Sequence, residues 1–346
     1  MSGDSAARVA VDAMGSDHGP RVVVEGAVSA CRDLGLRAIL VGPGALVEAE
    51  LRRASPTGLD IEVRDAPDVI AMGEKLSRLT LRKSSSIQVG LGLLRSGDAD
   101  AFFSAGNTAA CWTIAKSVLG RLCDVDRPAL ATMVPNVSGW TVLLDVGANA
   151  TCKARHLEEF AVMGHVYAQT VLKIPRPRVG LMSMGEEATK GHETIRSAHD
   201  VLRASRLNFI GNVEGHDVFT GIADVVVMDG FTGNVVLKAS ESLADALLAL
   251  IRQEIGRDPI GKLGALLLRR VFRAVKRRTD PAEPGGGLLL GVRGCCVIGH
   301  GRSTPYAIRQ GIRTAASFYE NRVNERIEQE IRLLQGTGET AKVGSA

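Results

Sequence analysis

Short apolar stretches alternate with longer segments of helical periodicity along almost the whole chain. The short stretches are rich in Val, Ile, Leu and Ala, which is typical of buried strands. They cover residues 8–12, 37–41, 59–63, 99–103, 129–134, 141–145, 178–183, 207–211, 223–228 and 292–298. The segments with helical periodicity cover residues 20–34, 45–54, 84–96, 107–119, 155–172, 191–204, 232–255 and 304–335. This alternation predicts an α/β fold, with a mainly parallel open sheet and helices on both of its faces.

The pattern predicts one α/β domain over residues 8–335 and a polar, Gly-rich tail at residues 336–346 that is expected to be disordered. Residues 257–284, called the arm below, interrupt the pattern. Residues 259–278 within it hold seven basic and no acidic residues. Plotted at 100° per residue, one face carries Ile260, Leu263, Leu267, Leu268, Val271, Ala274 and Val275, and the opposite face carries Lys262, Arg269, Arg273, Lys276 and Arg277. Such a helix either lies on an anionic membrane surface or packs on its own core.

Composition restricts the classes of partner. Of the 346 residues, 45% are hydrophobic and 23% are charged, which is typical of a soluble globular protein. Aromatic residues make up only 4%, too few for the stacking platforms that bind single-stranded nucleic acid. We expect no secretory signal and no membrane-spanning segment. The spacing of the six cysteines indicates free thiols in a reducing cytoplasm and predicts neither a metal site nor disulfides.

Six loops that follow predicted strands hold polar residues among glycines. If the sheet is parallel, all six lie at one of its edges, where ligands of open α/β sheets bind. Each loop precedes a helix, so its backbone N–H groups can converge on an anion such as phosphate. Taken singly, the polar side chains could simply cap helices. The six loops span residues 12–20, 104–108, 145–149, 185–192, 229–234 and 299–303.

Several nucleotide and hydrolase motifs are absent or incomplete. Gly42-Pro-Gly44 resembles the start of a dinucleotide fingerprint, but Val47 occupies the third glycine position. The loop at residues 185–191 has the components of a P-loop in the wrong order, and no Gly-x-Ser-x-Gly elbow is present. Lys190 either forms a surface ion pair or supplies a cation to phosphate or an oxyanion. His300 could bind phosphate, protonate a leaving group or bond a carbonyl.

The loops closely resemble, in sequence and order, those of the bacterial acyl-ACP:phosphate acyltransferases of phospholipid synthesis, the PlsX family. The resemblance extends from about residue 8 to residue 320. The matching motifs are Asp12-Ala-Met-Gly-Ser-Asp-His-Gly-Pro20, Ser104-Ala-Gly-Asn-Thr108, Asp126-Arg-Pro-Ala-Leu130, Leu144-Asp-Val-Gly-Ala-Asn149, Phe160-Ala-Val-Met-Gly164, Gly185-Glu-Glu with Lys190-Gly191, Gly211-Asn-Val-Glu-Gly215, Ala223-Asp-Val-Val-Val-Met-Asp-Gly-Phe-Thr-Gly-Asn-Val-Val-Leu-Lys238, and Ile298-Gly-His-Gly301.

The chain departs from the family pattern at four positions. Ser16 stands where the family usually has a second glycine, and Ala109 replaces the glycine that commonly follows Ser-Ala-Gly-Asn-Thr. Ser84 replaces an Asp that often precedes the Ser-Ser pair. Glu283 stands in a segment that lacks the usual Tyr before Gly-Gly.

The resemblance implies transfer of a long acyl chain from acyl carrier protein to inorganic phosphate, without a cofactor. It implies that a membrane-bound glycerol-3-phosphate acyltransferase uses the acyl phosphate. It also implies a fold like that of phosphate acetyltransferases and isocitrate/isopropylmalate dehydrogenases, a homodimer, and a cytoplasmic protein attached peripherally to the inner face of the cell membrane. The arm would then contact lipid or acyl carrier protein through Leu263, Leu267, Arg269, Val271, Arg273, Lys276 and Arg277.

On this basis we expect phosphate to attack the thioester directly, with no covalent enzyme intermediate. Lys190 would hold phosphate or neutralise the oxyanion, and Asn234 would orient or donate to the thioester oxygen. Residues expected to bind phosphate or substrate are Asp12, Gly15, Gly106, Asn107, Thr108, Asn149, Gly233, His300, Gly301 and Ser303.

Three alternatives compete with this hypothesis. A phosphate acetyltransferase acting on a short acyl-CoA would have no use for a basic amphipathic arm. A β-decarboxylating dehydrogenase would need a metal-binding Asp cluster or a nucleotide fingerprint, and neither is evident. A non-catalytic membrane-associated scaffold that binds acyl carrier protein would not need intact phosphate-type loops.

Overall fold

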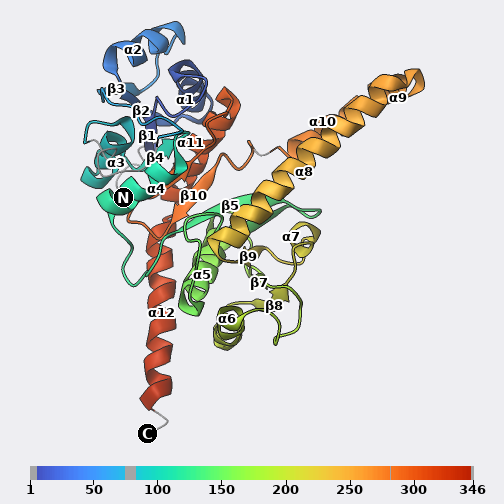
Figure 1. Cartoon of the computed structure of the whole chain (residues 1–346). Helices are drawn as coiled ribbons and strands as arrows, with labels where there is room; N and C mark the ends of the chain where they lie inside the picture. Colours follow the sequence, from blue (N-terminus) through green and yellow to red (C-terminus); the bar gives the residue numbers. More distant parts are fainter. Residues whose placement is uncertain (1–5, 75–82, 281, 344–346) are drawn as a thin grey trace.

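The computed structural model describes residues 6–74, 83–280 and 282–343, with side chains through Leu333. Eleven strands form one sheet in the order β3-β2-β1-β4-β11-β10-β5-β6-β9-β7-β8 (Figure 1). The strands are β1 (Arg8–Asp12), β2 (Arg37–Gly42), β3 (Ile61–Asp65), β4 (Ala101–Ser104), β5 (Ala129–Pro135), β6 (Trp140–Leu144), β7 (Val179–Met182), β8 (Phe209–Val213), β9 (Val225–Val227), β10 (Gly287–Leu290) and β11 (Cys295–Ile298).

Twelve described helices connect these strands. They are α1 (Pro20–Leu34), α2 (Gly44–Arg53), α3 (Ser86–Ser96), α4 (Thr108–Leu119), α5 (Ala154–Thr170), α6 (Glu193–Ala204), α7 (Asp217–Thr220), α8 (Gly230–Arg257), α9 (Pro259–Leu267), α10 (Arg269–Arg278), α11 (Pro305–Glu320) and α12 (Val323–Val343). None of the described helices is long and apolar enough to cross a membrane.

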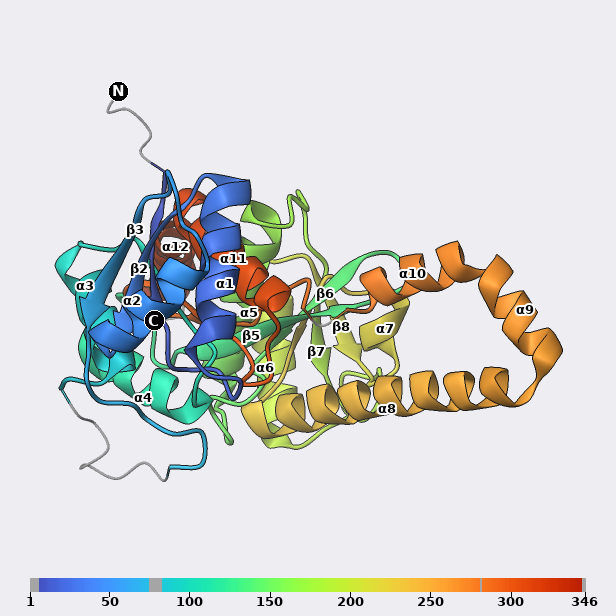
Figure 2. The same cartoon turned by 90° about the horizontal axis from the view of Figure 1, so that it is seen from above.

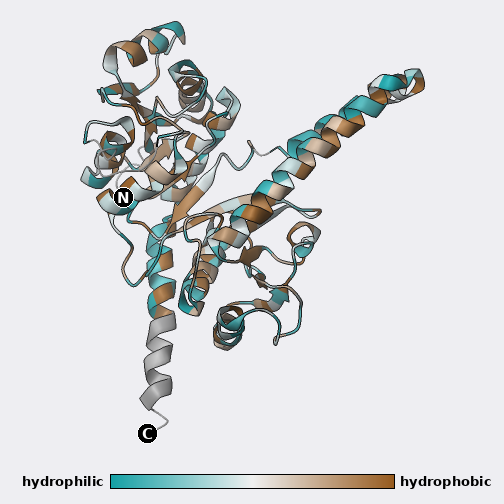
Figure 3. Cartoon of the chain, in the orientation of Figure 1, coloured by the Kyte–Doolittle hydropathy of each residue, from teal (hydrophilic) through white to brown (hydrophobic). Residues whose placement is uncertain are grey.

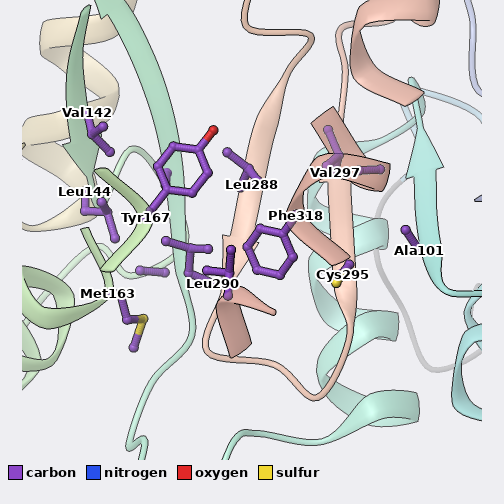
Figure 4. Packing of buried hydrophobic residues seen from close by; sticks show 14 of the residues in the cluster. Ala101, Val142, Leu144, Met163, Tyr167, Leu288, Leu290, Cys295, Val297 and Phe318 are labelled. Carbon is purple, nitrogen blue, oxygen red and sulfur yellow. The ribbon is translucent and has the colours of Figure 1, made fainter. Parts of the chain in front are cut away.

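Helices cover both faces of the sheet. Along β1, Val9 and Val11 belong to a core shared with α1, α5 and α11, whereas Ala10 belongs to a core shared with α3 and α4. This alternation follows from the strand period of two. Tyr167 of α5 and Phe318 of α11 pack beside the central strand β10 (Figure 4). The predicted fold class is therefore confirmed.

The sheet is not parallel throughout. Seven strand pairings are parallel, but β10 is antiparallel to both β11 and β5, and β5 is antiparallel to β6. These three reversals make β6, β9 and β7 run opposite to β1, β4 and β11. The expectation that all six loops lie at one edge is therefore wrong. Three loops follow strands that end at one edge, and three follow strands that end at the other.

The C-terminal part of the chain differs from the predicted pattern. The sequence predicts one strand at residues 292–298, whereas the structure forms a β10–β11 hairpin around Gly291 and Gly294. The predicted helix at residues 304–335 is two helices, because Arg322 between them adopts a positive φ of 50°. α12 continues through Val343, into the tail that was expected to be disordered. Residues 344–346 of that tail lie outside the described residues.

The arm projects from the body together with the outer part of α8 (Figures 1 and 2). Asp258 ends α8 and caps α9, since its carboxylate accepts from the backbone N–H groups of Ile260 and Gly261. The single helix predicted at residues 259–278 is broken at Leu268 into α9 and α10. α10 returns toward the body apart from α8 (Figure 2).

Candidate active site

The loops after β1, β4 and β11 interlock and form the first loop cluster. These strands are neighbours in the sheet. The Ser16 hydroxyl and the Asp17 N–H both donate to the carbonyl oxygen of Gly301, at 3.1 and 2.8 Å. A Cβ at Gly15 would lie 2.5 Å from the amide nitrogen of Gly106, so close backbone packing requires a glycine there. The structure therefore brings Gly15, Gly106 and Gly301 together, as expected.

Asp12 lies behind this cluster and does not face solvent. Its side chain is buried, and its carboxylate accepts from the Ser104 hydroxyl at 2.7 Å and from the Met14 N–H at 3.0 Å. Burial raises the pKa of the Asp12 carboxyl, while these hydrogen bonds oppose the rise. The Ser104 oxygen in turn accepts from the Gly106 N–H at 3.0 Å. Asp12 thus holds the loop from inside.

The side chain of Asn107 is engaged by its own chain. Its Oδ1 accepts from the Ala110 N–H at 3.0 Å, which makes it the N-cap of α4. Its Nδ2 donates to the carbonyl oxygen of Met72 at 3.0 Å. Thr108 begins α4 and is exposed, whereas Ser303 is buried just before α11. α4 therefore presents its N-terminal turn at the first loop cluster.

The loops after β6 and β9 form a second loop cluster around Asp145. This carboxylate is fully buried and accepts from four backbone N–H groups and one side-chain amide. The donors are the N–H groups of Leu130, Gly147, Ala148 and Asn149 and the Nδ2 of Asn149, at 2.7–3.1 Å. Burial raises the pKa of Asp145, and the hydrogen bonds act against it. The role of Asp145 as the organiser of this loop was not predicted from the sequence. Its only signal was its place directly after a buried strand.

Helix α8 begins inside the second loop cluster. The Gly230 N–H donates to the carbonyl oxygen of Asn149 at 2.7 Å. A Cβ at Gly233 would overlap the carbonyl oxygen of Asp145, so only glycine fits. Asn234 is exposed at the next position, and its Oδ1 lies 3.9 Å from the site of a Cβ on Gly147. Asn149, Gly233 and Asn234 are therefore brought together.

The same helix then reaches the first loop cluster. Lys238 Nζ lies 2.9 Å from Glu241 Oε2, and His300 Nε2 lies 3.7 Å from Glu241 Oε1. Desolvation and the Lys238 cation lower the pKa of His300, and Glu241 acts in the opposite direction. α8 thus connects loops that follow strands of opposite direction.

Lys190 stands in a third loop, after β7. Its side chain is exposed and packs its Cγ beside Gly185, and its N–H donates to the carbonyl oxygen of Glu187 at 2.9 Å. The same carbonyl accepts from Asn212 Nδ2 at 2.9 Å. No carboxylate among the described residues forms an ion pair with Lys190, so its cation remains available for an anionic ligand. Among the described residues, no hydrogen bond or ion pair joins Lys190 to the two clusters.

Three of the four departures from the family pattern form hydrogen bonds of their own. Ser16 bonds Gly301, as described above. The Ser84 hydroxyl donates to Asp68 at 2.8 Å. Glu283 accepts from the Tyr306 hydroxyl at 2.7 Å and from Gln310 at 3.0 Å. Ala109 is exposed near the start of α4.

A cavity of about 610 Å³ lies away from these loops. It is lined by Gly120, Arg121, Leu122, Asp124, Val125, Asp126, Arg155 and Arg293. Two of its three arginines are paired with acids, since Arg121 lies 3.3 Å from Asp126 and Arg155 lies 3.0 Å from Glu159. Within the described part of the chain, no group of three or more His, Cys, Asp or Glu residues could hold a metal ion.

Comparisons with known proteins identify the family of the chain. A family model described as "Fatty acid synthesis protein" matches residues 7–326. A phosphate acyltransferase from Acidobacterium capsulatum is 49% identical over 322 residues, covering 92% of this chain and 96% of the relative. A phosphate acyltransferase from Aquifex aeolicus is 43% identical, covering 94% of this chain and 97% of the relative.

Solved structures share the fold at low sequence identity. A phosphotransacetylase from Streptococcus pyogenes superposes with a TM-score of 0.63 at 17% identity, covering 91% of this chain and 94% of the other. A branched-chain phosphotransacylase from Enterococcus faecalis superposes with a TM-score of 0.55 at 14% identity, covering 90% and 99%.

Proposed function

The chain belongs to the fatty acid synthesis protein family, together with the phosphate acyltransferases it matches, and from this we propose that it transfers a long-chain acyl group from acyl carrier protein to inorganic phosphate. The observation that carries the proposal is the pair of glycine-lined loop clusters joined by α8. Each cluster lies at the start of a helix, where unpaired N–H groups and the helix dipole favour an anion.

Phosphate binding fits the first loop cluster. The close packing of Gly15 against Gly106 leaves this part of the wall without side chains. The N-terminal turns of α4 and α11 follow the loops that contribute Gly106 and Gly301, which favours a dianion there. Ser303 completes this wall, and His300 borders it. Asp12 is assigned a positioning role, because its carboxylate is buried and would repel phosphate.

The reaction needs alignment and charge stabilisation more than a strong base. Phosphate is already anionic near neutral pH and attacks the thioester carbon directly. Lys190 supplies a cation to phosphate or to the oxyanion, and Asn234 donates to the thioester oxygen. The exposure of both side chains, with no ion-pair partner for Lys190 among the described residues, fits these roles.

Two alanine variants test the assignment. In an assay with palmitoyl-ACP and phosphate, Lys190→Ala and Asn234→Ala should each lower kcat by roughly 100-fold or more, while the melting temperature stays close to that of the wild type. Lys173→Ala, at an exposed lysine that bonds Asn321 instead, is the matched control. Near-normal turnover in both variants would contradict the assignment. Wild-type turnover with acetyl-CoA alone would favour a short-chain phosphate acetyltransferase, and no turnover with any acyl donor would favour a scaffold.

The arm is proposed to place the enzyme at the cytoplasmic membrane surface. Ile260 and Leu267 are 80% and 77% exposed, beside basic residues on the other side of the helices. Figure 3 shows hydrophobic and hydrophilic residues alternating along α8, α9 and α10. Such a surface suits anionic lipid, into which an apolar acyl phosphate would pass toward a membrane-bound glycerol-3-phosphate acyltransferase.

Two further partners remain part of the proposal. The exposed leucines of α8 supply an apolar surface for a second copy of the chain in a homodimer, with Leu243, Leu247 and Leu250 at 50–61% exposure. Acyl carrier protein is acidic, so the arginines of the arm would also attract the acyl donor.

A further inference from the structure

His300 lies over α8 and faces a charged pair on that helix. Its Nε2 is 3.7 Å from Glu241 Oε1, and the other carboxylate oxygen of Glu241 is 2.9 Å from Lys238 Nζ. The His300 side chain is 61% exposed, so it borders solvent-accessible space next to the first loop cluster. Among the described residues, the Nδ1 of His300 has no hydrogen-bond partner. One ring nitrogen therefore faces a carboxylate and the other is available to a ligand.

The pair that His300 faces lies on the same side of α8 as Asn234. Lys238 and Glu241 follow Asn234 by four and seven residues, which places all three along one helix face. At 1.5 Å per residue, Glu241 lies roughly 10 Å along the axis from Asn234. The carbonyl oxygen and the sulfur of a thioester are bonded to one carbon, so Asn234 and His300 would act on that group from opposite ends of this helix face.

The proposed reaction leaves one proton to be moved. This step rests on the proposed function. As HPO₄²⁻ attacks, a C–O bond forms and the phosphate loses its proton. As the tetrahedral intermediate collapses, the C–S bond breaks and a thiolate leaves with the electron pair. An alkyl thiolate is a poorer leaving group than the phosphate that attacked, so transfer of the phosphate proton to sulfur favours collapse toward the acyl phosphate. No other reactant is required for the balance.

We propose that His300 is the catalytic residue that carries this proton from phosphate to the leaving sulfur. The neutral imidazole accepts the proton as the C–O bond forms, and the imidazolium donates it as the C–S bond breaks. Glu241 is a positioning residue that stabilises the transient imidazolium. Lys238 is a positioning residue that holds Glu241 in place.

The surrounding charges favour a neutral imidazole at rest. Lys238 on α8 and Arg302 on the same loop act with desolvation to lower the pKa of His300, and Glu241 on α8 opposes them. Asp17, on the loop after β1, comes close to neighbouring Gly301. A neutral imidazole can accept a proton at the pH of the cell, and the nearby carboxylate limits the cost of holding it.

The experiment compares leaving groups in wild type and His300→Gln. One substrate is palmitoyl-ACP, whose alkyl thiolate needs a proton. The other is a palmitoyl thioester of an aryl thiol carrying electron-withdrawing groups, whose thiolate leaves unprotonated. With palmitoyl-ACP, His300→Gln should lose about 100-fold or more in kcat, with little change in KM for phosphate. With the aryl thioester the loss should be below about tenfold, and Glu241→Gln should show a weaker form of the same contrast.

Two controls keep the outcomes separate. His216→Gln should leave both rates unchanged, because His216 is an exposed histidine that also lies beside two carboxylates, Glu214 and Asp217, but outside the loop clusters. Equal losses on both thioesters, or a loss expressed only in KM for phosphate, would assign His300 to phosphate binding and overturn the proposal. A wild-type protein inactive with every acyl donor would instead overturn the proposed function, and this proposal with it.

Discussion

The second loop cluster and the arm differ in the kind of side chain that each buries or exposes. In the second loop cluster the Asp145 carboxylate is 0% exposed and accepts five hydrogen bonds, all from its own chain. In the arm, Leu267 is 77% exposed, and no residue of α9 or α10 is buried. The loops therefore place charge inside, whereas the arm places apolar side chains outside.

The chain itself supplies the hydrogen bonds that the buried carboxylate needs, whereas the exposed apolar side chains of the arm need another molecule to cover them. A buried carboxylate would be costly without partners, and the loops supply them locally. A row of exposed leucines and valines is costly in water and becomes favourable only against an apolar surface. Changes in the loops should therefore alter folding and catalysis, and changes in the arm should alter association.

The largest expected effect comes from adding one methyl group to a glycine in each region. Gly233→Ala should destabilise the protein by roughly 3 kcal/mol, because the new Cβ would overlap the Asp145 carbonyl. Gly264→Ala in α9 meets nothing within 4 Å and should raise stability by up to about 1 kcal/mol through helix propensity. Thermal unfolding of both variants measures the difference. Equal melting temperatures of the two variants would contradict the expectation that only the loop cluster is closely packed around its glycine.

A charge on the apolar side of the arm should act on association without changing the fold. Leu267→Glu removes about 2 kcal/mol of potential apolar burial, so binding to anionic vesicles should fall by roughly 30-fold in cosedimentation. Leu46→Glu, at a 42% exposed leucine of α2, is the control and should bind vesicles like wild type. Vesicle binding unchanged by Leu267→Glu would argue against lipid as the partner, and a loss of dimer in sedimentation would assign the surface to the second chain.

Removing one positive charge from the arm tests whether its arginines bind lipid or acyl carrier protein. Arg273→Gln should weaken vesicle binding by about 1 kcal/mol, or roughly fivefold, with a smaller effect at high salt. If the arginine serves the carrier instead, KM for palmitoyl-ACP should rise while vesicle binding stays constant. Titrations at two salt concentrations against both partners distinguish the outcomes, and no effect on either would remove this arginine from both roles.

The smallest expected effect is on the pH dependence of the free energy of unfolding at acid pH. We expect this dependence to come from carboxylates of the body and not from the arm. His156 Nδ1 accepts from the Lys153 N–H, so its Nε2 donates to Asp126 at 2.7 Å and lowers the pKa of that carboxyl. The pKa of Asp126 is therefore lower in the folded protein than in the unfolded chain, where it is about 3.9, so the ionised carboxyl stabilises the fold above that pH. This stabilisation is lost as the pH falls through the pKa of the folded state.

Asp126→Asn should therefore flatten the acid limb of the stability profile, by less than about 1 kcal/mol because the Asp126 side chain is half exposed. Arginines of the arm stay charged over this range, so Arg273→Gln should leave the acid limb unchanged. Urea unfolding between about pH 3 and 6 measures both. An Asp126→Asn profile as steep as that of wild type would contradict the assignment.

The sequence predicted most of the helices and strands but not the directions in which all strands run. Val9 and Val11 alternate with Ala10 as a strand requires, and the loop glycines marked the strand ends. Strand direction leaves no such pattern when both faces are buried, so the sequence predicted a mainly parallel sheet without its three antiparallel pairings and one strand where β10 and β11 form a hairpin. Helix α8 connects the first and second loop clusters, but not the third loop with Lys190. Strand order alone does not predict this connection.

Roles that depend on neighbouring residues could be predicted from the sequence, whereas contacts between distant segments could not. Gly15, Gly106 and Gly233 were predicted to bind phosphate or substrate, and the structure places each where close packing requires a glycine. Asn107 proved to be a helix cap, which was the simpler of its two interpretations. The partners of Asp145 and the contact of His300 with Glu241 depend on segments far apart in sequence, and no spacing rule predicts them.

The position of β10 and β11 in the sheet has a consequence for the order of folding. These strands come from residues 287–298, yet they lie in the middle of the sheet, between β4 and β5. Until they are synthesised, β4 and β5 keep unpaired edges, and the two half-sheets have no strand in common. At elongation rates of about 5–20 residues per second, β5 is synthesised roughly 8–30 s before β10, and such pairings are delayed further by their long sequence separation. The nascent chain therefore carries two open sheet edges until its last quarter emerges, and that is the stage at which aggregation competes with folding.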